Sequence, residues 1–157
     1  MQGLSNAQGH WRPLQVRYYH TADLADVCRV ATDSLRERYD PSLFYQLVPY
    51  WPEGLIVVED LGRVIGFIFG VMSGPQQARI LMLAIEPRYR GRGLGTLLSG
   101  EFFRECGKKG VRQVNLEVRV SNAAAMRFYQ RLGFFNVCRA SHYYSDGEDG
   151  VFMMRYL

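Results

Sequence analysis

A turn rich in glycine and arginine is the segment of this sequence with the clearest chemical potential. Residues 88–98 read RYRGRGLGTLL, and an apolar helical pattern begins at their end. The first N–H groups of a helix have no intrahelical acceptor and carry partial positive charge, and glycine lets an anion approach them. The segment therefore predicts a phosphate or pyrophosphate site. The alternative is a plain glycine-rich turn with solvated arginines.

The spacing of the glycines excludes the two common nucleotide motifs. A dinucleotide fingerprint needs G-x-G-x-x-G, but neither Gly91 nor Gly93 has a glycine at the sixth position. A P-loop needs lysine after its second glycine, and the matching spacing that starts at Gly95 is followed by Glu101. The pattern that fits is Arg-x-x-Gly-x-Gly, which begins at Arg90.

Two further residues have side chains that could move protons. Glu117 alternates with Leu116 and Val118, so it points away from the apolar face of its expected strand. Tyr129 lies on the apolar face of an expected helix, beside Phe128. By pattern alone, the first is an exposed strand carboxylate and the second is a core tyrosine with a satisfied hydroxyl.

The elements that must position these residues follow from hydrophobic periodicity. We expect helices at 21–35, 43–48, 93–106 and 121–132, and a loop at 73–77. We expect strands at 14–19, 55–60, 63–72, 78–85, 111–120, 134–144 and 150–157. This order predicts an α/β (α+β) fold with an antiparallel start and crossover connections later.

Length and composition predict an ordinary globular protein. The chain has 157 residues and a formal net charge of +4, and we expect a flexible tail at 1–13 and a single domain at 14–157. No run of eighteen apolar residues is present, so no membrane span is expected. Cys28, Cys106 and Cys138 lack metal spacing and fall in apolar patterns. They indicate reduced core cysteines in a cytoplasmic protein, without a metal site.

Three other segments, together with the glycine turn, resemble one known family. Arg-x-x-Gly-x-Gly between an apolar strand and an amphipathic helix resembles the acetyl-CoA pyrophosphate loop of the GNAT N-acetyltransferases. LEVRVSNAAAMRFYQRLGF (116–134), HYYSDGEDGVFMM (142–154) and LRERYDPSLFYQ (35–46) are similar to the RimI-like and archaeal protein N-terminal acetyltransferases. The resemblance spans about residues 14–157. It implies a GNAT fold: a mixed, mostly antiparallel sheet of about seven strands, splayed between two middle strands and flanked by about four helices.

The resemblance implies acetyl-CoA as cosubstrate and assigns residues to it. The preceding strand would pair with the pantetheine arm, and the N–H near Leu83 would face the developing oxyanion. The residues implied in cofactor binding are Leu83, Ala84, Ile85, Arg90, Gly91, Arg92, Gly93, Leu94, Gly95, Thr96, Asn122 and Tyr129.

The same resemblance implies two catalytic residues. Glu117 matches the proposed base, which would take the amine proton directly or through water. Related branches have histidine at that position and a tyrosine base on the preceding strand, where this chain has Arg79, so the identity of the base stays open. Tyr129 matches the general acid that would stabilise or protonate the departing thiolate.

The implied substrate is the α-amine of a protein N-terminus, on a ribosomal protein or nascent chains. Tyr39, Tyr143 and Tyr144 match the peptide clamp of this branch. The ribosome or an auxiliary subunit is a further candidate partner, and the site of action would be cytoplasmic. The alternatives are acetylation of a lysine side chain or small amine, and a non-catalytic acetyl-CoA-binding or RNA-associated module. Specific nucleic-acid binding is not expected, because the arginines cluster at the glycine turn.

Overall fold

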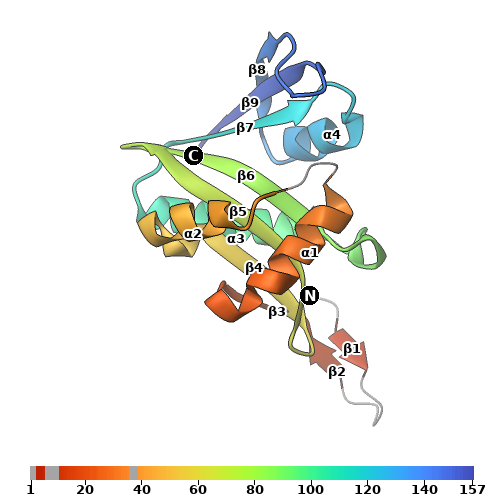
Figure 1. Ribbon diagram of the computed structural model, residues 1–157. Coiled ribbons are helices and arrows are strands. Elements are labelled where there is room, and N and C mark those ends of the chain that lie inside the picture. The colour runs from red at the N-terminus through yellow and green to blue at the C-terminus, as the bar shows by residue number, and fades with distance from the viewer. Residues whose placement is uncertain (1–2, 6–10, 36–38) are drawn as a thin grey trace. The chain divides into compact units, whose positions relative to one another are not determined.

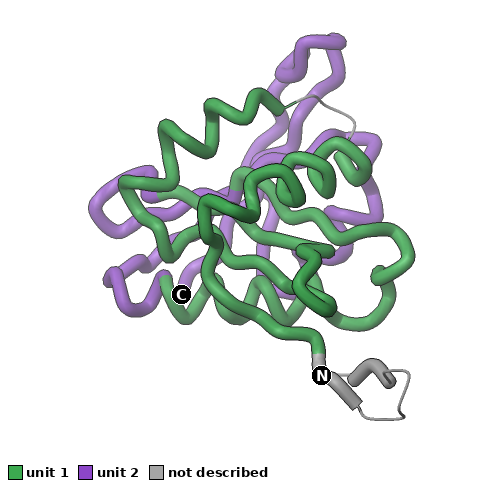
Figure 2. The backbone as a smooth tube through the Cα atoms, turned by 60° about the horizontal axis from the view of Figure 1, so that its bottom comes forward, with its two compact units in different colours: residues 1–71, 81–105 green, residues 72–80, 106–157 purple. Residues whose placement is uncertain are grey.

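A computed structural model describes residues 3–5, 11–35 and 39–157 of the chain. It divides into two compact units, which Figure 2 shows in different colours. The first unit comprises residues 1–71 and 81–105, and the second comprises residues 72–80 and 106–157. The glycine turn belongs to the first unit, whereas Glu117 and Tyr129 belong to the second.

The helices and strands are labelled in Figure 1. The strands are β1 (Gly3–Ser5), β2 (Trp11–Pro13), β3 (Gln15–Tyr18), β4 (Leu55–Asp60), β5 (Arg63–Gly74), β6 (Gln77–Ile85), β7 (Gln113–Arg119), β8 (Phe135–Ala140) and β9 (Gly150–Tyr156). The α-helices are α1 (Leu24–Ser34), α2 (Ser42–Leu47), α3 (Leu94–Lys108) and α4 (Ala123–Arg131). Short 3-10 helices are η1 (Thr21–Asp23), η2 (Val48–Tyr50), η3 (Pro52–Gly54) and η4 (Pro87–Tyr89).

Seven strands form one sheet in the order β3-β4-β5-β6-β7-β9-β8, and β1 pairs with β2 separately. The pairs β3–β4, β4–β5, β7–β9 and β8–β9 are antiparallel, and β6–β7 is parallel. The β6–β7 ladder joins Gln77–Arg79 to Gln113–Asn115. The mostly antiparallel seven-stranded sheet and the four α-helices of the described residues confirm the expected fold. The expected splay would begin where the β6–β7 ladder ends.

The first unit packs helices on its strands. Leu61 and Gly62 both have positive φ, at 50° and 82°, which is typical of the type I′ turn of a tight hairpin and joins β4 to β5. Figure 1 shows α1 and α2 in front of these strands and α3 behind them. The ring of Phe44 stacks on that of Phe69 with centroids 5.1 Å apart. One cluster of core residues comprises Val27, Val30, Ala31, Phe44, Leu55, Val57, Val64, Phe67, Phe69, Met82 and Ala84.

The second unit is built on β7, β9 and β8, with α4 beside them. The inner face of β7 is the predicted one, because Val114, Leu116 and Val118 are buried and the residues between them are partly exposed. Met153 of β9 is also buried and is the register partner of Leu116.

Three expectations about boundaries and burial are wrong. The expected loop 73–77 is shorter, because β5 runs to Gly74 and β6 begins at Gln77. The strand expected at 134–144 ends at Ala140, because the following segment turns and His142 adopts a φ of 54°. Cys138 is exposed rather than in the core, since β8 is the last strand of the sheet order and is exposed along most of its length.

Candidate functional site

The glycine turn adopts the backbone that its composition predicts. η4 ends at Tyr89 and α3 begins at Leu94. Gly91 and Gly93 have φ angles of 75° and 79°, in the left-handed region that favours glycine. A Cβ atom at either residue would meet no atom within 4 Å. The backbone angle therefore demands glycine here, and the turn leaves room for an anion to approach the main chain.

Main-chain N–H groups of this turn are available to such an anion. The N–H of Leu97 donates to the carbonyl of Gly93 at 3.0 Å, which starts the helical ladder. The amides of residues 94–96 have no acceptor within the helix. The N–H of Arg90 instead donates to the carbonyl of Pro87 at 3.2 Å. The main-chain donors expected to bind the pyrophosphate are therefore those of residues 91–96. These amides at the positive end of α3 fit a pyrophosphate group.

Two arginines of the turn lie against a buried tyrosine. The guanidinium carbons of Arg88 and Arg92 lie 5.3 and 5.2 Å from the centre of the Tyr89 ring. The hydroxyl of Tyr89 donates to the carboxylate of Asp60, at the end of β4. Burial and this hydrogen bond raise the pKa of Tyr89, so its hydroxyl remains a donor. Tyr89 thus anchors the turn to the β4–β5 hairpin.

A buried carboxylate fixes the start of the same turn. Glu86 precedes η4, and its N–H donates to the carbonyl of Ile65 at 2.8 Å. Its carboxylate pairs with Arg63 at 2.9 Å and with Arg29 at 3.3 Å. Because Glu86 is buried, these two arginines supply the compensation that its charge needs. The end of β6 is therefore tied to both β5 and α1.

The residues expected along the pantetheine arm, 83–85, are the last three of β6. Gly66 of β5 allows the close approach of this segment, because a Cβ there would lie 2.6 Å from Ile85 Cδ1. The carbonyl of Ile85 accepts hydrogen bonds from Arg90 Nε at 3.0 Å and from Ser34 Oγ at 3.2 Å. The side chain of Arg90 is therefore turned toward the strand rather than toward the turn amides.

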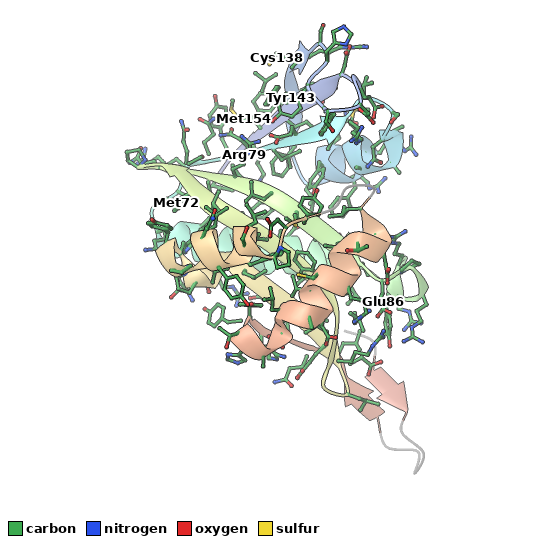
Figure 3. All side chains as sticks on the ribbon, in the orientation of Figure 1. Met72, Arg79, Glu86, Cys138, Tyr143 and Met154 are labelled. Atoms are coloured by element: carbon green, nitrogen blue, oxygen red, sulfur yellow. The ribbon has the colours of Figure 1, made fainter. Side chains whose placement is uncertain are left out.

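Glu117 lies in a hydrogen-bonded cluster in the second unit. The guanidinium of Arg79 contacts Glu117 Oε1, and the hydroxyl of Tyr143 donates to the same oxygen at 3.0 Å. Arg79 also donates to the Tyr143 hydroxyl at 3.2 Å. Figure 3 labels Arg79 and Tyr143, which come from β6 and from the segment between β8 and β9. The cluster brings together the expected base and one of the expected substrate-binding tyrosines.

The pairing of β6 with β7 explains why Arg79 reaches this carboxylate. Arg79 is the register partner of Asn115, two residues before Glu117, so both charged side chains lie on the same face of the sheet. Burial lowers the pKa of Arg79, but the bonds to Tyr143 and the charge of Glu117 outweigh it, so the pKa is raised. Sequence reasoning missed this contact. The signal was a charged residue near the start of the otherwise apolar segment ARILMLAI (78–85).

The expected substrate tyrosines Tyr143 and Tyr144 lie beyond the end of β8. The ring of Tyr143 packs against that of Phe152, with centroids 5.2 Å apart. The absence of a side chain at Gly150 permits this packing, because a Cβ there would lie 3.0 Å from the Tyr143 ring. The Tyr144 ring lies 4.1 Å from the guanidinium carbon of Arg119. Both tyrosines are therefore held by specific contacts.

Tyr129 is a buried residue of α4. Its ring packs edge-on against Phe128 and Phe134, with centroids 5.2 and 5.5 Å away. Its hydroxyl makes no hydrogen bond with the part of the chain that the structure describes. Burial raises the pKa of Tyr129 well above its ordinary value. The phenol therefore keeps its proton and is suited to donate a hydrogen bond.

Two other expected residues have identifiable structural roles. Asn122 caps α4, since its Oδ1 accepts from the N–H of Ala125 at 3.1 Å. Tyr39 is partly buried against the core of the first unit. Its expected substrate segment, 35–46, includes residues 36–38, which lie outside the described residues.

Metal-binding clusters and membrane-spanning helices are both absent from the described ranges. No group of three or more His, Cys, Asp or Glu side chains is placed there to hold a metal ion. No helix in those ranges is long and apolar enough to cross a membrane.

Comparison with known proteins shows the family of this chain. The profile of the Acetyltransferase (GNAT) family matches residues 23–134. N-alpha-acetyltransferase 30 of Schizosaccharomyces pombe is 36% identical over 130 residues, which cover 80% of this chain and 87% of that protein. The crystal structure of Ard1 from Thermoplasma volcanium has a TM-score of 0.88 and 35% identity, over 92% of this chain and 97% of that one.

A bacterial structure has the same fold. The ribosomal-protein-S18-alanine N-acetyltransferase of Escherichia coli has a TM-score of 0.80 and 26% identity, over 92% of this chain and 94% of that one. Since the family profile covers most of the sequence and carries the glycine turn, this chain belongs to the Acetyltransferase (GNAT) family.

Proposed function

We propose that this chain transfers an acetyl group from acetyl-CoA to the α-amine of protein N-termini. The observation that carries the proposal is the glycine turn, whose left-handed Gly91 and Gly93 open the main chain at the positive end of α3. Relatives named as an N-alpha-acetyltransferase and as a ribosomal-protein-S18-alanine N-acetyltransferase support the α-amine as acceptor. Acetylation of a lysine side chain or a small amine, and cofactor binding without catalysis, are the competing functions.

In this proposal the first unit holds the cofactor. Amides from Gly91 to Thr96 bind the pyrophosphate, and the main chain of residues 83–85 pairs with the pantetheine arm. The N–H near Leu83 donates to the carbonyl oxygen as negative charge develops on it. Asn122 of the second unit caps α4 through Oδ1, so its amide nitrogen remains available for the pantetheine region. Acetyl-CoA supplies an acetyl group activated as a thioester.

The second unit supplies proton transfer. An α-amine with a pKa of about 8 is mostly protonated at neutral pH, so it must lose a proton before its nitrogen can form the new C–N bond. Glu117 accepts that proton directly or through water. As the C–S bond breaks, Tyr129 donates a hydrogen bond to the departing sulfur. Tyr39, Tyr143 and Tyr144 bind the first residues of the peptide.

The setting of the reaction is part of the proposal. Cys28, Cys106 and Cys138 form no disulfide in the described structure, as is typical of a reducing compartment, which supports a cytoplasmic site of action. Some relatives are parts of complexes, such as the NatB complex that contains NAA20. We accordingly include an auxiliary subunit or the ribosome among the candidate partners.

A peptide panel tests the proposed reaction. Purified protein and acetyl-CoA would be incubated with peptides that differ in their first two residues. Each peptide would also be prepared with a blocked α-amine and a free lysine. We expect mass spectrometry to show acetylation at the free α-amine and none on the blocked peptides. Turnover of lysine or of small amines alone would contradict the proposed substrate, and calorimetric binding of acetyl-CoA without any turnover would favour the non-catalytic alternative.

Tyr129→Phe isolates the proposed hydrogen bond to sulfur. Because the hydroxyl has no partner among the described residues and the ring packing is kept, thermal stability should not fall. The acetyl-transfer rate should fall by about tenfold to a hundredfold, because this factor corresponds to the free energy of a hydrogen bond to a charged group. Single-turnover kinetics measure that rate, and calorimetry checks that acetyl-CoA still binds. An acetyl-transfer rate equal to that of the wild-type protein would show that the Tyr129 hydroxyl has no role in the mechanism.

A further inference from the structure

The proposed function gives no role to Arg79, a charged residue in the hydrogen-bonded cluster around Glu117. Its guanidinium contacts Glu117 and donates to Tyr143, so it joins the expected base to an expected substrate-binding residue. The three residues belong to one compact unit. Besides Arg79 and Tyr143, the neighbours of Glu117 are apolar on β9, where its register partner is Phe152. Among the described residues, Arg79 is therefore the cation in direct contact with this carboxylate.

The contacts leave one side of the carboxylate open. Arg79 and Tyr143 both bind Oε1 of Glu117, and Oε2 makes no hydrogen bond with any described residue. The Glu117 side chain is 18% exposed and that of Arg79 is 34% exposed, so neither charge is fully removed from solvent. The pair thus fixes the orientation of the carboxylate while one of its oxygens stays available to a proton donor.

The pairing is not optimised for stability. Arg79 Nε is buried and has no hydrogen-bond partner in the described part of the chain. A buried unpaired donor costs free energy, commonly about 1–3 kcal/mol. Natural proteins keep few such groups, and those that persist call for an explanation. A role in positioning Glu117 gives that explanation.

We propose that Arg79 is a positioning residue that holds Glu117 through Oε1, so that Oε2 is aimed at the amine or its water. This inference rests on the proposed function and names a determinant of its proton transfer. Arg79 also balances the charge of Glu117. Without it, the carboxylate would bind the unreactive ammonium form of the substrate more readily, because a nearby cation would no longer oppose that binding.

Kinetics of Arg79→Met and Arg79→Lys test the proposal. For Arg79→Met we expect kcat to fall about tenfold or more, the effect of a misplaced reacting group, while KM for the peptide stays equal or falls. Arg79→Lys keeps a cationic donor and should recover most of the lost rate. In a Glu117→Gln background, Arg79→Met should add less than about a twofold loss, since residues acting as a unit are not additive. Arg127→Met, at an exposed arginine of α4, is the matched control and should leave the kinetics unchanged.

Three outcomes would overturn the role of Arg79. They are an unchanged kcat in Arg79→Met, a loss of equal size in the Glu117→Gln background, and no recovery in Arg79→Lys. NMR of the Arg79 guanidinium separates this inference from the proposed function, because it needs no turnover. Restricted rotation in the unmodified protein that is released by Glu117→Gln supports the contact, and free rotation refutes it. A protein that acetylates no peptide yet shows restricted rotation would contradict the proposed function alone.

Discussion

Glutamine at position 117 is expected to lower kcat for N-terminal acetylation by about a hundredfold or more, the usual contribution of a general base. Gln has nearly the same shape and can still accept hydrogen bonds from Arg79 and Tyr143, so the cluster around it should remain folded. What it loses is the ability to take a proton from the amine. Steady-state kinetics on the best peptide of the panel measure the effect.

Binding of acetyl-CoA separates catalysis from folding in this experiment. Calorimetry should give the same Kd for Glu117→Gln as for the unmodified protein, because Glu117 has no assigned contact with the cofactor. Glu101→Gln changes a partly exposed carboxylate of α3 in the same way and should leave kcat unchanged. A Glu117→Gln protein with full activity would assign the base to another group, or to water alone.

Alanine at both Gly91 and Gly93 is expected to weaken acetyl-CoA binding by between about thirtyfold and a thousandfold. Each residue has a positive φ that costs a residue with a Cβ about 1–2 kcal/mol. The free double variant relaxes the turn to escape that strain and moves the amides away from the pyrophosphate, so CoA binding has to restore the strained backbone. Calorimetric titration with CoA measures the loss, which corresponds to roughly 2–4 kcal/mol.

The matched control lies in α3, the helix that follows the turn. Gly100 and Gly107 are exposed residues of α3, and a Cβ at either would meet no atom within 4 Å. Alanine at both should raise stability by about 1 kcal/mol per residue, since alanine is the better helix former, and should leave CoA affinity unchanged. Equal affinity of the Gly91/Gly93 variant and this control would show that the turn does not bind the cofactor.

Local patterns predicted most elements of the fold because each depends on neighbouring residues. LIVVED (55–60) reads as a buried strand and is β4 as expected. The glycine turn was also predictable, because positive φ angles favour glycine and the start of the helix shows as an apolar helical pattern in the sequence. The burial of Tyr129 followed from its place on an apolar helix face.

Contacts between distant segments were not predictable in this way. The contact of Arg79 with Glu117 depends on the parallel register of β6 on β7, which no local pattern encodes. The segment that carries Tyr143 was expected to be a strand, but it forms a turn. Hydrogen bonds to side chains stabilise this turn, such as the one from the N–H of His142 to the carboxylate of Asp149 at 2.9 Å. The exposure of Cys138 depends on the position of β8 at the end of the strand order.

The ion pairs of Glu86 limit which residues of this protein can be substituted. Arg29 and Arg63 are far from the glycine motif in sequence, and a survey of motif residues would count both as free to vary. Both nonetheless compensate the buried carboxylate from which the turn begins. Loss of either arginine would leave the buried carboxylate without one of its two counter-charges. We expect this loss to weaken the binding of acetyl-CoA, although neither arginine belongs to the motif.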